Sequence, residues 1–192
     1  MTGVGLPGIS RPLLIRNRSK QTALSVEVGS LGAPFTVEGA GHYTIGPGSF
    51  ITVMIDLDPS TVGVANGSLA ILSGDPKHPQ ANVAIRSNVL AGRLSAPRRI
   101  SFTTKAGTNA SKTVNLKNVG RGMISGTVQQ FPPGSAFELV DAPVRFTLAP
   151  GATQPVTINF NGTSAGRATA DLAIETTPPP ATTTVVVSGA TR

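Results

Sequence analysis

The chain alternates apolar and polar residues in short runs, which is the pattern of β-strands with one buried face. Clear examples are Phe50–Ile55 and Pro155–Phe160, which contain many β-branched residues. Turn residues such as Gly46-Pro47-Gly48 and Pro150-Gly151 precede these runs. No segment shows sustained helical spacing with capping residues, so we predict an all-β protein with essentially no helix.

The pattern occurs twice along the chain. Asn17 and Asn118 each close a strand-like run, and further matches follow in the same order, at an offset of about 101 to 103 residues. They pair 45–48 with 148–151, 69–71 with 172–174, and 83–85 with 185–187, and we also align Phe50–Ile55 with Pro155–Phe160. We therefore predict two tandem immunoglobulin-like β-sandwich domains, residues 1–93 and 94–192, of about seven strands each, end to end.

The second copy resembles a known domain family. The resemblance rests on Asn118-Val119-Gly120 after a strand, a following Phe137, Leu148-Ala149-Pro150-Gly151, Phe160 and Gly166. This order is similar to that of ASH/hydin-type (choice-of-anchor D-like) immunoglobulin-like domains. The first copy departs from it, with Asn17-Arg18-Ser19 and Leu57 at the matching places. The resemblance implies a sandwich used as a spacer, array element or protein-binding module on cell surfaces or in cilia and centrosomes, without enzymatic activity.

Composition excludes several kinds of chemistry. The chain has no cysteine, so it has no disulfide, thiolate metal site or cysteine nucleophile. No apolar run reaches the length of about 18 residues that a membrane-spanning helix needs. The N-terminus lacks the pattern of a secretory signal. We place the protein outside the cell or at the cell surface because of the family resemblance.

Charge is the distinctive physical feature of the second copy. The chain carries a net charge of +7; residues 1–92 contribute +1 (6 basic, 5 acidic) and residues 93–192 contribute +6 (10 basic, 4 acidic). Such a surface could contact an anionic polysaccharide or lipid, or it could simply be solvated. Few aromatic residues are available to stack bases, which disfavours nucleic acid. The residues predicted for a polyanion contact near the domain junction are Arg93, Arg98, Arg99 and Lys105.

No catalytic, cofactor or metal site is predicted. His42 and His78 lie among turn residues, and there is no Gly-x-Ser-x-Gly motif. Asp56 and Asp58 could bind a hard cation together with Asp75, but the second copy has amides at the matching places, so we interpret them as polar strand ends. Four Asn-x-Ser/Thr sequons begin at Asn17, Asn66, Asn109 and Asn161.

The predicted function is a non-catalytic structural or protein-binding module, for adhesion or spacing, within a larger repeat or cell-surface protein. Its partner would be a protein or another copy. Alternatives are a polyanion- or carbohydrate-binding accessory module, an accessory domain of a hydrolase, and a self-assembling filament or phage subunit. The leading strand of the first copy is weak, since only Thr2–Leu6 could supply it where the second copy has Arg99–Thr103. We therefore expect the first copy to have the more open sheet edge.

Overall fold

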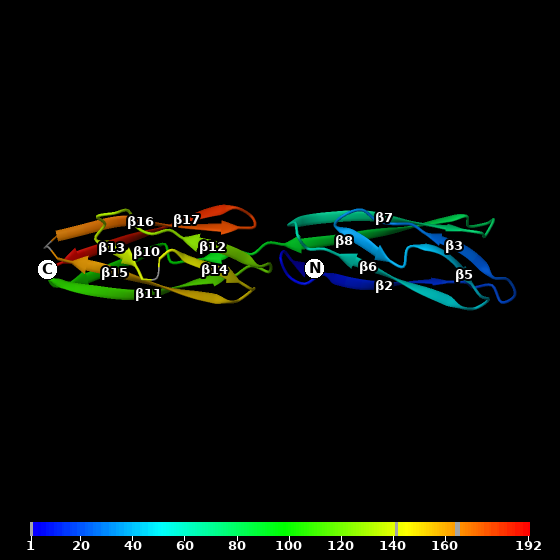
Figure 1. Cartoon of the computed structure of the whole chain (residues 1–192), viewed down its shortest axis with the longest axis horizontal. Helices are drawn as coiled ribbons and strands as arrows, with labels where there is room; N and C mark the ends of the chain where they lie inside the picture. Colours follow the sequence, from blue (N-terminus) through cyan, green and yellow to red (C-terminus); the bar gives the residue numbers. More distant parts are fainter. Residues whose placement is uncertain (1, 141, 164–165) are drawn as a thin grey trace. The chain divides into compact units, whose positions relative to one another are not determined.

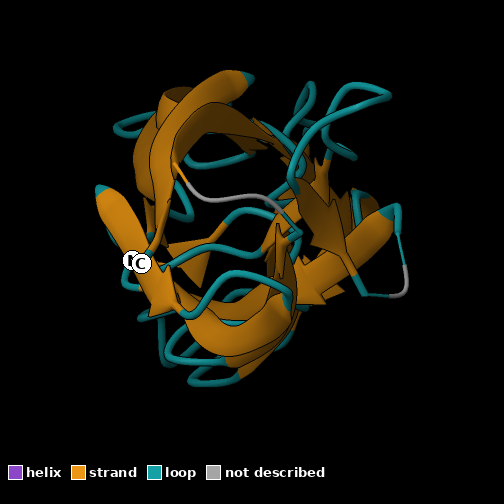
Figure 2. Ribbon diagram, turned by 90° about the vertical axis from the view of Figure 1, so that its left-hand side faces the viewer, coloured by secondary structure: helices purple, strands orange, loops and turns teal. Residues whose placement is uncertain are grey.

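The structure is a computed structural model, which describes residues 2–140, 142–163 and 166–192. The chain forms two compact units, Met1–Val89 and Leu90–Arg192. Strands and loops make up the described residues, which contain no helix (Figures 1 and 2). The all-β prediction and the two immunoglobulin-like sandwiches are confirmed.

The N-terminal unit is built from two facing sheets. One sheet has the order β1-β8-β7-β3-β5 and the other the order β2-β6-β4. The strands are β1 (Thr2–Gly3), β2 (Ile9–Arg16), β3 (Leu24–Val28), β4 (Phe35–Glu38), β5 (Gly41–Ile45), β6 (Phe50–Leu57), β7 (Gly63–Ser73) and β8 (Gln80–Leu90).

The C-terminal unit has the same two-sheet arrangement, but its first strand in the five-stranded sheet is longer. Its sheets have the orders β10-β17-β16-β12-β14 and β13-β15-β11-β9. The strands are β9 (Leu94–Ser95), β10 (Arg99–Thr104), β11 (Thr108–Asn118), β12 (Ile124–Val128), β13 (Phe137–Leu139), β14 (Val144–Leu148), β15 (Thr153–Gly162), β16 (Gly166–Thr177) and β17 (Ala181–Thr191). The long β10 runs parallel to β17, whereas the corresponding β1 has only two residues.

Buried and exposed residues alternate along the strands, and the buried ones form the cores of the two units. In β17, Val185, Val187 and Gly189 are buried, and the residues between them face outward. Because side chains of a strand point to opposite faces in turn, each strand delivers every second residue to the space between the sheets. The C-terminal core is one continuous cluster that contains five phenylalanines. The N-terminal core consists of two smaller clusters.

In each unit, the side chain of a buried asparagine forms hydrogen bonds to the backbone of neighbouring segments. The Asn118 side chain donates to the carbonyls of Gly122 and Leu148, at 2.8 and 2.9 Å, and accepts the amides of Arg93 and Gly120. The Asn17 side chain donates to the Thr22 and Ile45 carbonyls, at 2.8 and 3.0 Å. These bonds satisfy carbonyls inside the sandwich, where an unpaired polar group would be costly.

Two details differ from the sequence-based expectations. Strand registers place Arg11 opposite Ile55 and Lys112 opposite Ile158, so Ile55 matches Ile158. Our alignment of Phe50–Ile55 with Pro155–Phe160 was therefore wrong by two residues, a shift that alternation alone cannot detect. The C-terminal unit also takes in residues 90–93, and Ala91 and Arg93 accept backbone hydrogen bonds from residues 119–122.

Candidate functional site

The predicted polyanion residues all belong to the C-terminal unit and are exposed. Arg93 precedes β9; its amide donates to the side-chain oxygen of Asn118, and its carbonyl accepts the Val119 amide. Arg98 and Arg99 lie at the start of β10, in the opposite sheet. Lys105 follows the other end of β10, about 20 Å along the strand from Arg99. Arg98 and Arg99 are adjacent, whereas Lys105 lies beyond the other end of β10.

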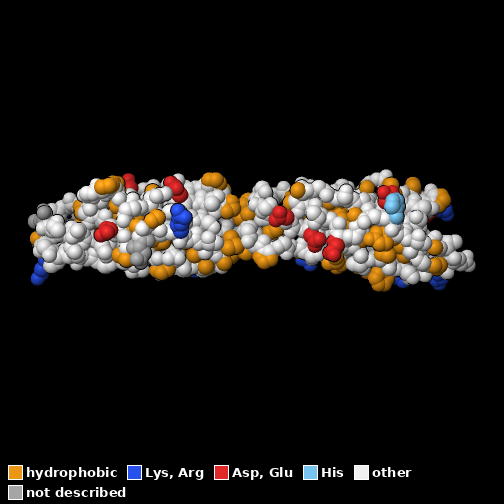
Figure 3. Space-filling model, in the orientation of Figure 1, with side chains coloured by type: hydrophobic (Ala, Val, Ile, Leu, Met, Phe, Trp, Pro, Cys, Tyr) orange, Lys and Arg blue, Asp and Glu red, His pale blue; other side chains and the backbone are white. Residues whose placement is uncertain are grey.

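Within the described residues, these charges have no acidic partner. Among the described residues, the structure contains a single ion pair, between His42 Nε2 and Glu27 Oε1 at 3.7 Å in the N-terminal unit. On the face of the molecule in Figure 3, acidic and basic side chains are few compared with uncharged ones. The basic residues are thus free to contact an anion, and they are equally able to remain solvated.

Groups that could perform catalysis are not brought together in the described part of the chain. The sheet register places Asp56 opposite Ser10 and Thr36, while the Asp75 carboxylate accepts the Lys77 amide at 2.9 Å in a turn. Among the described residues, no group of three His, Cys, Asp or Glu side chains could hold a metal ion. His42 and His78 are both exposed.

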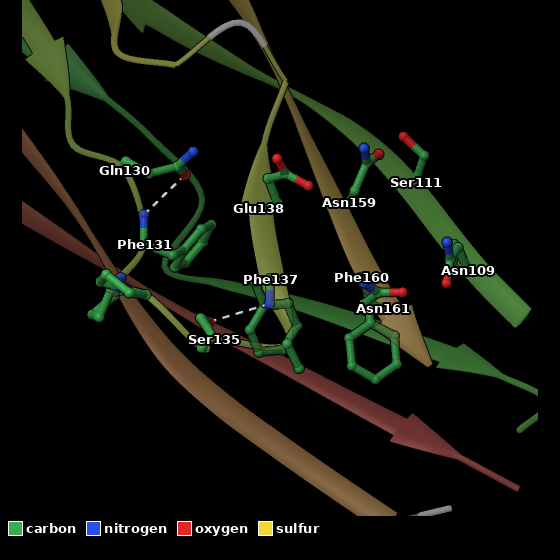
Figure 4. Close-up of a pocket in the computed structure, with 15 residues that line it drawn as sticks. Asn109, Ser111, Gln130, Phe131, Ser135, Phe137, Glu138, Asn159, Phe160 and Asn161 are labelled. Atoms are coloured by element: carbon green, nitrogen blue, oxygen red, sulfur yellow. Dashed lines mark hydrogen bonds between the residues drawn. The ribbon is translucent and has the colours of Figure 1, made fainter. Parts of the chain in front are cut away.

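A polar groove of about 490 Å³ lies on the C-terminal unit (Figure 4). Its polar side chains come from three neighbouring strands, with Glu138 and Ser111 both opposite Asn159, and Asn109 opposite Asn161. The Gln130 side chain orders the adjoining loop, since its oxygen accepts the amides of Phe131 and Leu139 at 3.0 and 3.1 Å. Phenylalanines of the core pack beneath the polar side chains.

The groove offers hydrogen-bonding side chains and one carboxylate. Glu138 is the single acidic side chain among its lining residues, so the groove does not offer the two carboxylates that glycoside hydrolysis requires. The sequon residues Asn109 and Asn161 are exposed here, and Asn66 is exposed on β7, whereas Asn17 is buried. Sequence reasoning noted the asparagines as sequons and did not bring them together, because only the strand register makes them neighbours.

The second candidate surface is an apolar groove of about 640 Å³ in the N-terminal unit. It opens between β8 on one side and β2 and β6 on the other, at the edge where the sequence predicted a weak leading strand. Its apolar lining includes Ile9, Phe35, Ile55, Val83 and Ile85. The sequence predicted the open edge but not the groove, because the groove depends on which core positions the missing strand leaves uncovered.

The fold defines the class of this protein as tandem immunoglobulin-like sandwiches. Residues 99–190, nearly all of the C-terminal unit, match the family described as HYDIN/CFA65/VesB-like, Ig-like domain. The C-terminal unit is therefore an immunoglobulin-like domain of the ASH/hydin type, which confirms the resemblance seen in its sequence. The fold is thus that of a structural or binding module.

Several solved structures are similar to this chain at low identity. A protein of unknown function from Porphyromonas gingivalis is 15% identical, with 98% of this chain and 94% of that chain covered and a TM-score of 0.42. The human CEP192 ASH/PapD-like domain 7 is 19% identical, with coverages of 53% and 84% and a TM-score of 0.41. The Vibrio cholerae VesB protease is 13% identical, with coverages of 89% and 63% and a TM-score of 0.40.

No curated protein sequence matches the chain. Within the described residues, no helix is long and apolar enough to cross a membrane.

Proposed function

We propose that the chain is a non-catalytic structural and protein-binding module, for spacing or adhesion, within a larger repeat or cell-surface protein. The observation that carries the proposal is the duplicated immunoglobulin-like sandwich, whose described residues present strands at the ends of their sheets and, in the N-terminal copy, an apolar groove. An unpaired strand edge offers N–H and C=O groups that an added strand can bond, and the groove beside it can take side chains. Such a surface binds polypeptide.

The proposal is tested by immobilising the full chain and exposing it to surface proteins of the source cells, with sedimentation of the free chain to detect self-association. A protein captured in a fixed ratio, or a defined oligomer, supports the module. A chain that stays monomeric and captures no protein, or that cleaves envelope polymers, overturns the proposal.

A second candidate function, binding of an anionic polymer, is favoured by the basic residues of the C-terminal unit, which form no ion pair within the part of the chain that the structure describes. Arg98 and Arg99 are adjacent and exposed. Binding to heparin that weakens with added salt and with the Arg98→Ala/Arg99→Ala double variant would support it. If no binding occurs at low salt, the positive charge is only solvated surface.

A further inference from the structure

The outer face of the β2-β6-β4 sheet in the N-terminal unit carries exposed apolar residues. The odd-numbered Leu13, Ile15 and Ile51 pack into the core, so the even-numbered residues of β2 and β6 point away from it. On this face, Leu14 and Phe50 are each 58% exposed. Figure 3 shows apolar side chains gathered over β2 and β6. Single exposed apolar residues are common on protein surfaces, whereas a contiguous patch marks an interaction site.

These apolar residues are contiguous. Leu14 lies directly opposite Thr52, which places it diagonally between Phe50 and Met54, and Pro12 lies opposite Met54. Diagonal neighbours on one face of an antiparallel pair are about 7–8 Å apart, within reach of side chains of this length. We call Pro12, Leu14, Phe50 and Met54 the apolar patch.

The matching face of the C-terminal unit is polar. Because Ile55 matches Ile158, the four positions of the apolar patch correspond to Thr113, Asn115, Thr153 and Thr157. Thr113 and Thr157 bond each other through their hydroxyls at 2.8 Å, and Asn115 and Thr153 are exposed. This face stays open to solvent although β9 and β10 both precede it in the chain. The fold therefore requires no apolar residue at these positions, and the apolar patch belongs to the N-terminal copy alone.

Opposite charges flank the apolar patch at its two ends. Arg16 lies opposite Phe50, at the beginning of β6. Toward the other end of β6, Glu38 lies opposite Met54, and Asp56 follows two residues later. Phe50 and Asp56 are about 20 Å apart along the strand. Within the described residues, none of these charged side chains forms an ion pair.

A face with this order of charges is complementary to itself. When a second copy is turned so that its strands run in the opposite direction, the basic end of each face lies against the acidic end of the other. A two-fold axis produces this arrangement and closes the dimer. The matching face of the C-terminal unit cannot pair in this way, because Val140 and Asn159 occupy the places of Glu38 and Asp56.

We propose that the outer face of the β2-β6-β4 sheet binds the same face of a second copy of the chain about a two-fold axis. The two apolar patches pack together, and Arg16 of each copy lies beside Glu38 and Asp56 of the other. Three strands of up to eight residues give a face of about 25 by 15 Å, so two faces bury about 800–1,000 Å² in total, as in weak, reversible complexes. This inference rests on the proposed protein-binding function and names a second copy as the partner.

The first test measures sedimentation of the full chain from low micromolar to high micromolar concentration, which should show a monomer–dimer equilibrium. Leu14→Asn/Phe50→Thr installs the residues of the C-terminal unit in the apolar patch and should raise the dissociation constant at least tenfold. Asn115→Ala/Thr153→Ala, the matched control on the other unit, should leave it within twofold. A chain that is monomeric throughout, or a dimer that the first variant does not weaken, would overturn the proposal.

The second test exchanges the charges and fixes the direction of pairing. Arg16→Glu alone, or Glu38→Arg/Asp56→Arg alone, places like charges together at both ends of the dimer and should weaken self-association at least tenfold at low salt. An equimolar mixture of the two variants should form a heterodimer with a dissociation constant within threefold of that of the unchanged chain. Lys117→Glu, which matches Arg16→Glu in the C-terminal unit, should have no effect. A mixture that associates no better than either variant alone contradicts the proposal.

The outcome separates this inference from the function on which it rests. If the chain captures surface proteins and stays monomeric, the protein-binding function stands and the self-association face is wrong. If Leu14→Asn/Phe50→Thr abolishes capture by a monomeric chain, the face binds a different protein, which likewise overturns a second copy as occupant. Tyr43 fluorescence verifies that each variant keeps the N-terminal unit folded, because Tyr43 is the single tyrosine of the chain.

Discussion

The two units have the same plan but close it differently. In the C-terminal unit, β10 pairs with β17, and its Ile100 and Phe102 join a single core cluster. In the N-terminal unit, the corresponding edge has only β1, and the core divides into two clusters. The length of the strand that pairs with β17 or β8 therefore determines whether the core of the sandwich is continuous or leaves a groove.

The largest loss of stability is expected from substitutions that remove a hydrogen bond between β17 and the segment that leads into β10. The Val186 amide donates to the Arg98 carbonyl at 3.1 Å, whereas the matching Ala84 faces the open edge. Val186→Pro should lower the free energy of unfolding of the C-terminal unit by about 3 kcal/mol or more. Ala84→Pro, its matched control, should cost less than about 1 kcal/mol, since it removes no ladder bond. Urea unfolding followed by far-UV circular dichroism measures both, and equal costs would contradict the open edge.

The next effect tests what the two units share. Asn118 and Asn17 are 0% and 3% exposed, and each bonds two or more backbone carbonyls. Replacing either by alanine leaves those carbonyls without a partner and should cost about 2 to 3 kcal/mol in its own unit. Tyr43 fluorescence reports unfolding of the N-terminal unit, and hydrogen exchange reports that of the C-terminal unit. A cost below about 1 kcal/mol for either variant would show that its asparagine is dispensable.

A smaller loss of stability should distinguish the tightly packed core of the C-terminal unit from the core of the N-terminal unit. A Cβ on Gly189 would lie 2.3 Å from a ring carbon of Phe160, so Gly189→Ala should cost about 1 to 3 kcal/mol through overpacking. The matching residue in the N-terminal unit is Ser87, which already carries a side chain beside the groove. Ser87→Ala should change stability by less than about 0.5 kcal/mol. Thermal unfolding of both variants provides the measurement, and a neutral Gly189→Ala would refute the tight packing of Phe160.

The smallest effect concerns the basic surface. Arg98 and Arg99 are exposed and form no ion pair within the described residues, so the Arg98→Ala/Arg99→Ala variant should change stability by less than about 0.5 kcal/mol. Any heparin binding should nevertheless fall, and its dependence on salt should become shallower. A large loss of stability would mean that these arginines are structural.

Much of the fold could be predicted from the sequence because the same pattern of strands and turns occurs in two copies. The buried Asn17 and Asn118, and the apolar residues at 83–85 and 185–187, mark matching strands whatever lies between them. The position of Ile55 relative to Ile158 could not be predicted, since a shift by two residues keeps every side chain on the same face.

The candidate sites were predictable only in part. The weak leading strand of the first copy indicated an open edge, and the basic residues could be counted. The groove at Ile55, Val83 and Ile85 required knowledge of which strands are neighbours. The polar groove likewise depends on the register that places Asn109 opposite Asn161.

The central claim is that β8 lacks the cover that β10 gives to β17, and hydrogen exchange of individual amides tests it most directly. We predict that Ala84 and Arg86 exchange at rates close to those of an unprotected chain, while Val186 and Ser188 are protected at least a hundredfold. Equal protection of the two pairs in the free chain would show that the edge is already covered and would contradict the account.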